Sequence, residues 1–196
     1  MLGKVRVGLF GTEGHQIHED LREHPRGEVV AVCGFESDTV PDYLSNVNNY
    51  ETLDELLMDD SIQLISFCSP FKDEQGWQII NALEAGKHVY AEKPCCLEEL
   101  VLDGIIAASK RTGMRFHEMN ACSFVQPYTT LRDLVQDGAI GEVIQIQSQK
   151  SYPWTDWRPK DERIDGGLTR QVGIYNLRLA EHVAGLKVSS LEIRET

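Results

Sequence analysis

Short apolar runs that alternate with helical segments constrain the fold of this chain more than any other feature of its sequence. The runs span 4–10, 28–33, 63–68, 88–91 and 114–117, and helices are predicted between them at 15–23, from 53 onward, at 74–84 and at 97–109. Such short, nearly continuous runs are typical of strands that are buried on both faces of a parallel sheet. Their alternation with helices predicts βαβ units and hence a doubly wound parallel sheet, an α/β fold.

Two of the predicted helices carry local signals. Thr52 and Glu55 have the spacing of a capping box, in which each side chain accepts a hydrogen bond from the other residue's backbone N–H. Trp77 lies at helical spacing with Ile80 and Leu83, which predicts that its ring packs in the core.

The regular alternation of predicted strands and helices ends near Asn120, where a second domain is expected to begin. Its predicted elements are helices at 126–136 and 168–183 and strands at 142–149 and 187–194. The sequence therefore predicts two domains, 1–120 and 121–196, the second being a truncated α/β domain with an open sheet. An uncovered sheet edge and face favour association, so a homo-oligomer or a complementing subunit is expected.

Charge narrows the classes of partner. The 196 residues include 31 acidic and 19 basic side chains, a formal net charge of −12. This charge repels the phosphates of nucleic acids and of anionic membranes, so neither is expected as a partner. His15 and His18 share a helix face, but two such residues at the start of a helix are usually solvated, and no metal site is predicted.

Cysteine content and the first residues indicate a cytoplasmic protein. The sequence starts with a strand-like segment, and neither a signal peptide nor a long apolar span is expected. The cysteines are odd in number and lack the spacing of a zinc site, which indicates reduced thiols. They are Cys33, Cys68, Cys95, Cys96 and Cys122.

A glycine-rich turn, Gly8 to His15, joins the first predicted strand to the first helix. In the turn of a Rossmann dinucleotide-binding domain, the first glycine allows the tight turn and the second lets the backbone approach the pyrophosphate. Gly11 fits the first position, whereas Glu13 occupies the second and Gly14 comes one residue late. Two interpretations are open. Either Glu13 points outward while Thr12 and His15 assist the phosphates, or the turn does not bind a dinucleotide.

Two charged residues follow predicted strands at the edge of the sheet where ligands bind. Glu36 comes after the second strand, where an acid often bonds the ribose 2′-hydroxyl; a solvated loop carboxylate is an equal alternative. Lys93 follows the strand at 88–91 and could donate a hydrogen bond or a proton to a substrate oxygen. A surface lysine is the alternative. Pro94 fixes the direction of the chain after Lys93, which a cis peptide bond would also achieve.

The stretch Ala85-Gly86-Lys87-His88-Val89-Tyr90-Ala91-Glu92-Lys93-Pro94 resembles a specific signature of the Gfo/Idh/MocA family, the glucose–fructose oxidoreductase and inositol dehydrogenase type. The resemblance covers essentially the whole chain, including Val5–Gly14, Ser69-Pro70, 137–143, Trp157-Arg158, Gly166-Gly167 and Gly173-Ile174-Tyr175. It implies a Rossmann domain followed by an α/β domain whose open sheet shapes the substrate site. It also implies hydride transfer between NAD or NADP and a sugar, a polyol or a similar small hydroxylated substrate.

The resemblance assigns roles to particular residues. Lys93 is similar to the family's catalytic lysine, and Tyr175 stands where a histidine is common and where one branch has a tyrosine as acid/base. Gln171 replaces an aspartate and, with Lys93 and Tyr175, is expected to bind the substrate. The residues expected to bind the cofactor are Gly11, Thr12, Glu13, Gly14, His15, Glu36, Ser69, Pro70, Glu92, Lys93, Pro94, Trp157 and Arg158.

The chain also departs from the family pattern. The histidine that is common a few residues after Pro70 is absent, Arg178 replaces a later aspartate, and family members are considerably longer. The prediction is therefore an NAD(P)-dependent oxidoreductase. The alternative is a non-catalytic, shortened member that binds a nucleotide, a sugar or a partner subunit, or a fragment of a split enzyme.

Overall fold

The chain folds as two compact units, Met1–Met119 and Asn120–Thr196. The structure is a computed structural model that describes residues 3–36, 40–120, 123–152, 155–156 and 159–194. Among the described helices, none is long and apolar enough to cross a membrane.

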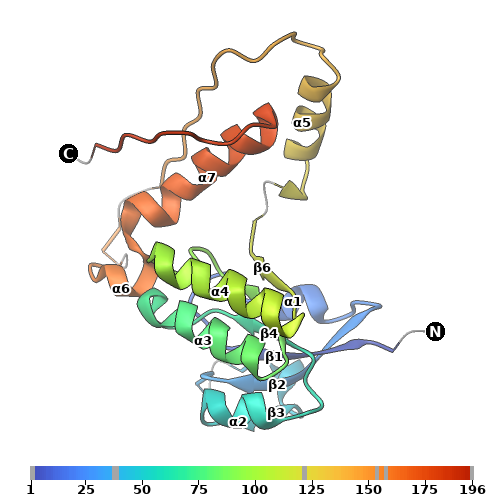
Figure 1. The fold of residues 1–196 in the computed structure, drawn as a ribbon. Coiled ribbons are helices and arrows are strands. Elements are labelled where there is room, and N and C mark those ends of the chain that lie inside the picture. Colours follow the sequence, from blue (N-terminus) through green and yellow to red (C-terminus); the bar gives the residue numbers. More distant parts are fainter. Residues whose placement is uncertain (1–2, 37–39, 121–122, 153–154, 157–158, 195–196) are drawn as a thin grey trace. The chain divides into compact units, whose positions relative to one another are not determined.

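A six-stranded parallel sheet forms the centre of the first unit (Figure 1). Its strands are β1 (Val5–Phe10), β2 (Gly27–Cys33), β3 (Asn48–Tyr50), β4 (Leu64–Phe67), β5 (His88–Ala91) and β6 (Phe116–Glu118). They lie in the order β3-β2-β1-β4-β5-β6, and every neighbouring pair is parallel. This order defines a Rossmann sheet, so the predicted doubly wound fold is confirmed. The sequence did not predict β3, because this edge strand has no apolar pattern.

Helices cover both faces of this sheet. They are α1 (His18–Leu21), the 3-10 helix η1 (Asp42–Leu44), α2 (Leu53–Met58), α3 (Lys72–Glu84) and α4 (Glu99–Thr112). The helix expected at 15–23 is therefore much shorter than predicted. The capping box of Thr52 and Glu55 is confirmed, since each side chain accepts a hydrogen bond from the other's backbone N–H.

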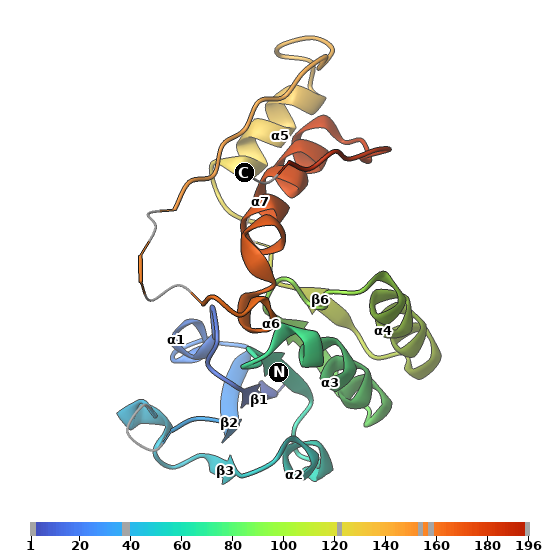
Figure 2. The same cartoon turned by 90° about the vertical axis from the view of Figure 1, so that its left-hand side faces the viewer.

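The alternation of side chains along each strand divides the core into two parts. On β2, Ala31 and Cys33 pack in the cluster formed with α2, α3 and α4, whereas Val32 packs in the cluster that includes residues of α1 and η1. Figure 2 shows α1 on the opposite side of the sheet from α3 and α4. Both faces of the central strands are thus buried, which explains why their sequences are apolar throughout.

The prediction that Trp77 packs in the core is wrong. Its side chain is 59% exposed, although Leu83 in the same helix is fully buried. The buried face of α3 runs through Gln75, Gly76 and Ile79, and this places Trp77 beyond the edge of the buried stripe. Helical spacing identified the right helix but misjudged which of its faces packs against the sheet, because two of the packing positions hold a glycine and a glutamine.

The second unit is described by its helices. These are α5 (Tyr128–Gln136), α6 (Glu162–Asp165) and α7 (Gly167–Ala184). The helices α5 and α7 match those predicted at 126–136 and 168–183, whereas the short α6 was not predicted. The strands predicted at 142–149 and 187–194 are not formed: both segments are irregular. A strand exists only through hydrogen bonds to a neighbouring strand, and an alternating pattern cannot supply that neighbour.

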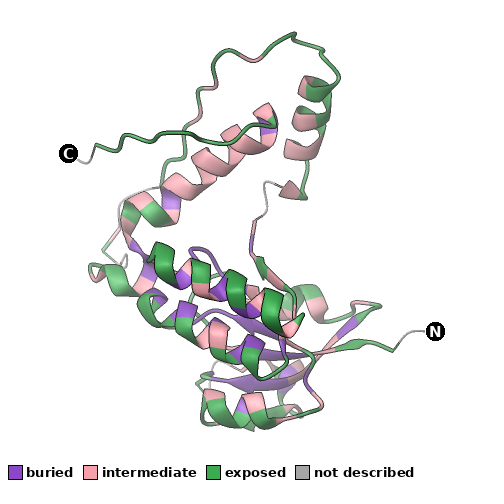
Figure 3. Cartoon of the chain, viewed as in Figure 1, coloured by how far each residue is buried: buried purple, intermediate pink, exposed green. Residues whose placement is uncertain are grey.

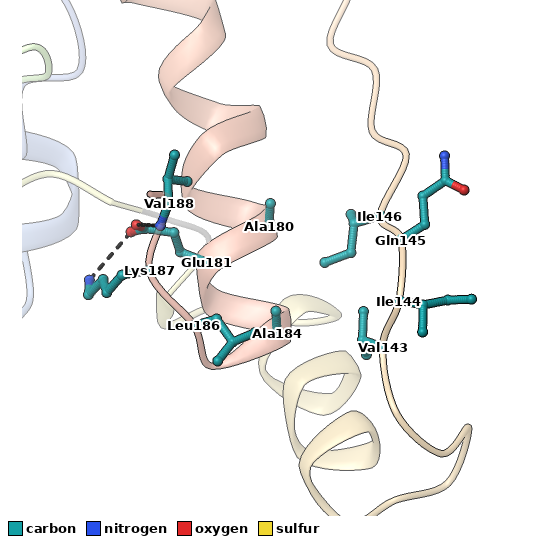
Figure 4. A pocket seen from close by; sticks show the side chains of 10 residues that line it. All are labelled: Val143, Ile144, Gln145, Ile146, Ala180, Glu181, Ala184, Leu186, Lys187 and Val188. Carbon is teal, nitrogen blue, oxygen red and sulfur yellow. Dashed lines mark hydrogen bonds and ion pairs between the residues drawn. The ribbon is translucent and has the colours of Figure 1, made fainter. Parts of the chain in front are cut away.

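Many apolar side chains of the second unit are exposed. Figure 3 shows buried residues gathered on the sheet and on the inner faces of α3 and α4, whereas α5 has none. Ile144 is 94% exposed, and Leu186 and Val188 are exposed as well. A groove of about 310 Å³ lies between segment 143–146 and the end of α7 (Figure 4).

Candidate functional site

The ends of β1, β4 and β5 form one edge of the sheet in the first unit. The strand order reverses between β1 and β4, because β1 pairs with β2 on one side and with β4 on the other. Open α/β sheets bind ligands in the crevice at the carboxyl ends of strands at such a reversal. The glycine turn follows β1, Ser69 and Pro70 follow β4, and Glu92 to Pro94 follow β5.

Gly11 makes the turn after β1 in a way that only glycine permits. Its φ is +72°, and a Cβ there would lie 2.2 Å from the Cys68 carbonyl oxygen at the end of β4. The backbone N–H of Glu13 donates to that same oxygen at 3.0 Å, and the Glu13 side chain is exposed. The hydrogen bond thus joins the turn to the end of β4 and leaves the Glu13 side chain in solvent.

Gln16 connects the turn to β4 by hydrogen bonds, a role that the sequence did not reveal. Its side-chain amide donates to the Gly11 carbonyl oxygen at 2.9 Å, and its Oε1 accepts from the Ser66 hydroxyl of β4 at 2.6 Å. Gln16 occupies the position of the third glycine in the dinucleotide-binding pattern. At this position a glycine would let the helix pack closely against the sheet. Here the longer Gln16 side chain connects the segment before α1 to β4 through hydrogen bonds.

Glu92 connects the end of β5 to the glycine turn. The residue is 2% exposed. Its Oε2 accepts from the His15 backbone N–H at 2.5 Å and lies 2.8 Å from His15 Nδ1. Burial acts to raise the pKa of Glu92, but the hydrogen bonds from His15 outweigh it and hold this pKa below its ordinary value. Gly14 leaves room for the contact, since a Cβ there would lie 2.7 Å from the Glu92 side chain.

Gln75 of α3 organises the backbone on both sides of Lys93. Its amide nitrogen donates to the carbonyl oxygens of Glu92 at 2.8 Å and Pro94 at 3.1 Å. Its Oε1 accepts from the buried Lys72 ammonium at 2.8 Å. Burial lowers the pKa of Lys72. In the sequence, only the absence of the histidine that is common after Pro70 drew attention to this region. No sequence pattern predicted that Lys72 is buried.

Lys93 lies inside this polar cluster. The residue is only 5% exposed, and its Nζ is 4.0 Å from Glu92 Oε1. The peptide bond between Lys93 and Pro94 is cis. Ser69 is also buried, and its hydroxyl donates to Gln78 Oε1 at 2.6 Å, whereas Pro70 is exposed. The structure thus brings Gly14, His15, Glu92 and Lys93 together at one edge.

The other residues that the sequence singled out lie elsewhere or outside the described part of the chain. Glu36 follows β2 and is exposed. Gln171 and Tyr175 lie one turn apart on α7 of the second unit, both half-buried, and the Lys150 ammonium is 4.9 Å from the centre of the Tyr175 ring. Trp157 and Arg158 fall outside the described residues. In the described part of the chain, no three His, Cys, Asp or Glu side chains are placed to hold a metal ion.

A Rossmann sheet with a glycine turn after β1 and a buried lysine after β5 defines a dinucleotide-binding class of protein. Residues 5–120 match the model of an oxidoreductase family with an NAD-binding Rossmann fold, and residues 128–194 match the GFO/IDH/MocA C-terminal domain. The chain belongs to the Gfo/Idh/MocA family, as its sequence motifs predicted. Its first unit carries the family's NAD-binding fold.

Known proteins of this family are similar over most of the chain. An uncharacterized oxidoreductase of Rhizobium meliloti is 30% identical over 91% of this chain and 56% of its own length. The myo-inositol 2-dehydrogenase of Thermotoga maritima is 24% identical over 97% of this chain and 56% of its own length. The chain thus spans a little over half the length of these relatives.

Solved structures share the fold. A 3-ketoreductase from Actinomadura kijaniata, in complex with NADP and TDP-benzene, superposes with a TM-score of 0.75 at 22% identity and covers 91% of this chain and 57% of that one. At this level of identity the likeness establishes the fold alone.

Replacing Gly11 by alanine tests the close approach of the turn to β4. Gly113, which ends α4 at φ +75° with nothing near its Cβ position, is the matched control. We expect Gly113→Ala to lower the free energy of unfolding by about 1 to 2 kcal/mol from backbone strain alone. Gly11→Ala also overlaps the Cys68 carbonyl and should cost about 3 kcal/mol or more. Urea denaturation measures both; equal losses would contradict the observed packing.

Replacing Glu92 by glutamine tests the link between β5 and the turn. Because the folded pKa lies below the ordinary value of 4.5, the ionised carboxylate stabilises the fold above about pH 4.5, and this contribution is lost as the pH falls through the folded pKa. We expect Glu92→Gln to cost about 1.5 to 3 kcal/mol at neutral pH and less at about pH 3. Urea denaturation at both pH values measures this. The exposed Glu99→Gln is the control, and a loss for Glu92→Gln that does not change with pH would refute the assignment.

Proposed function

We propose that this chain is an NAD(P)-dependent oxidoreductase, or the larger part of one, that acts on a sugar, a polyol or a similar small hydroxylated molecule. The observation that carries the proposal is the buried Lys93, which lies after β5 beside the glycine turn in a chain of this family. A lysine that is shielded from water and placed at the ligand-binding edge is suited to bind a substrate oxygen.

The residues after β1, β4 and β5 would hold the dinucleotide. Gly11 and Gly34 support this assignment, since both have positive φ and a Cβ at Gly34 would lie 3.5 Å from the Gly11 nitrogen, so the backbones after β1 and β2 come close together. Thr12, Gly14 and His15 line the turn, Glu36 follows β2, and Glu92 and Pro94 flank Lys93. Trp157 and Arg158 are assigned to the same cofactor through the family pattern.

The nicotinamide would supply the site that accepts or donates hydride, and this chain's residues would handle the proton and the position of the substrate. Lys93 would hydrogen-bond the reacting oxygen and stabilise the negative charge that develops there. Tyr175 would pass the proton, and Gln171 would orient a hydroxyl one turn away. We assign the first unit to the cofactor and the second to the substrate and to oligomerisation.

A second function is favoured by the chemistry of the turn. Glu13 would bring a carboxylate close to the phosphates of a dinucleotide bound at the turn, and the His15 N–H already donates to Glu92. Both features weaken dinucleotide binding relative to an uncharged turn. They favour a non-catalytic member that binds a partner subunit or a sugar, or one half of a split enzyme.

Fluorescence titration with NADH and with NADPH separates the two functions. Saturable binding in the micromolar range supports the oxidoreductase. Lys93→Ala should then lower kcat/KM for a sugar or polyol substrate by at least about a hundredfold, as expected when a group that stabilises transition-state charge is removed. Lys110→Ala, a change of an exposed lysine on α4, is the control. Undiminished activity of Lys93→Ala would refute the mechanism, and absent binding by folded protein would favour the second function.

The exposed apolar surface of the second unit supports association with another copy of the chain. Sedimentation velocity at micromolar concentration should show a species larger than the monomer, because a patch this apolar is rarely left in water. Ile144→Glu and Leu186→Glu should shift that species toward the monomer. Leu100→Glu, at an equally exposed position on α4, should not. A strictly monomeric, folded wild-type chain would contradict the proposal.

A further inference from the structure

Two adjacent thiols lie directly after the Lys93-Pro94 bond. Cys95 is buried, Cys96 is half-buried, and their sulfur atoms are 3.9 Å apart. The pair sits in the loop between β5 and α4, next to α3. A Cβ added to Gly76 of α3 would lie 2.8 Å from the Cβ of Cys96, so the absence of a side chain at Gly76 allows Cys96 to pack closely against α3.

The pair differs chemically from the other described cysteines. Burial raises the pKa of Cys33 to about 11 and that of Cys68 to about 12, which keeps both protonated and unreactive. The hydrogen bond from the Cys95 thiol lowers the pKa of Cys96, although burial opposes it. Among the described cysteines, Cys96 combines partial exposure, a neighbouring sulfur and a lowered pKa, which are the properties of an oxidisable cysteine with a resolving partner.

We propose that Cys95 and Cys96 form a reversible redox site that hydrogen peroxide oxidises to a disulfide between the two adjacent residues. The neighbouring Cα atoms are about 3.8 Å apart, closer than the roughly 4.4 to 6.8 Å that disulfides prefer. A disulfide closed over such a short span is readily reduced again, which is the behaviour of labile, regulatory disulfides.

The reaction balances with the peroxide as the oxidant. The Cys96 thiolate attacks the O–O bond, which forms an S–O bond and releases one water after proton uptake. The Cys95 thiol then attacks that sulfur, the S–S bond forms, the S–O bond breaks, and a second water leaves. The two thiols lose two electrons and two protons, and the peroxide is reduced to two waters.

The oxidised pair would disturb the backbone that carries Lys93. The Cys95 N–H donates to Glu118 Oε1 at 2.8 Å, and the Cys95 carbonyl accepts from the Gln75 amide at 3.3 Å. The same Gln75 nitrogen holds the carbonyl oxygens of Glu92 and Pro94. The disulfide closes a ring that contains the 95–96 peptide bond, and a twist of this peptide would strain these hydrogen bonds. Because the same bonds position the backbone at Lys93, oxidation should weaken nicotinamide binding. This consequence rests on the proposed function.

Mass spectrometry of the full chain after mild hydrogen peroxide treatment tests the site directly. We expect the peptide with both cysteines to lose two hydrogens, to resist alkylation, and to regain both thiols with dithiothreitol. Cys95→Ser and Cys96→Ser should each abolish this product, whereas Cys122→Ser should leave it unchanged. Full alkylation of both cysteines after peroxide, a disulfide to Cys122 or to another chain, or direct conversion to sulfinic acid would overturn the proposal.

NADH titration of the reduced and oxidised chain tests the consequence. We expect about tenfold weaker binding after oxidation, the loss that one or two broken hydrogen bonds produce, with recovery after reduction and no change in Cys96→Ser. An unchanged Kd with the disulfide present would refute the link to the cofactor. If the reduced chain does not bind NADH, the proposed function and this link both fail, while the mass measurement still decides the redox site.

Discussion

The contact between the buried Glu92 carboxylate and His15 connects the elements at the functional edge of the first unit. It joins the end of β5 to the turn after β1, across the intervening strand β4. A charged group that is removed from water requires partners. The Glu92 carboxylate obtains them from the backbone N–H and ring of His15 and from the backbone N–H and ammonium of Lys93. The turn and the lysine are therefore held in one arrangement by a single carboxylate.

Around that contact, two glutamine side chains hold the backbone, one of them, Gln16, at the position of the third glycine of the dinucleotide-binding pattern. Gln16 bonds the turn to β4. Gln75 bonds the carbonyl groups of Glu92, Pro94 and Cys95, which flank Lys93, and also the buried Lys72. A glutamine has both donors and an acceptor, so one residue can satisfy several buried backbone groups. The edge of the sheet is thus a connected polar network, and a change in the Cys95–Cys96 segment would be transmitted to Lys93 through Gln75.

The candidate site was predictable where a residue type carries its own geometric requirement. Gly11 could be placed because only glycine adopts positive φ beside a neighbouring backbone, and Lys93 because it follows a buried strand at the ligand-binding edge. The partners of these residues were not predictable. Gln75 lies 17 to 20 positions from the carbonyl groups it bonds, and no local pattern specifies which polar side chain will meet them.

The sequence by itself determined five strands of the parallel sheet, the longer helices of the first unit and the family, because apolar runs and a specific motif depend only on local order along the chain. Tertiary structure alone decided that Trp77 faces solvent, that Glu92 meets His15, and that segments 142–149 and 187–194 stay irregular. Each of these depends on what lies opposite a residue in space. Burial and strand pairing depend on a segment and on the part of the fold that packs against it, whereas a sequence pattern describes the segment alone.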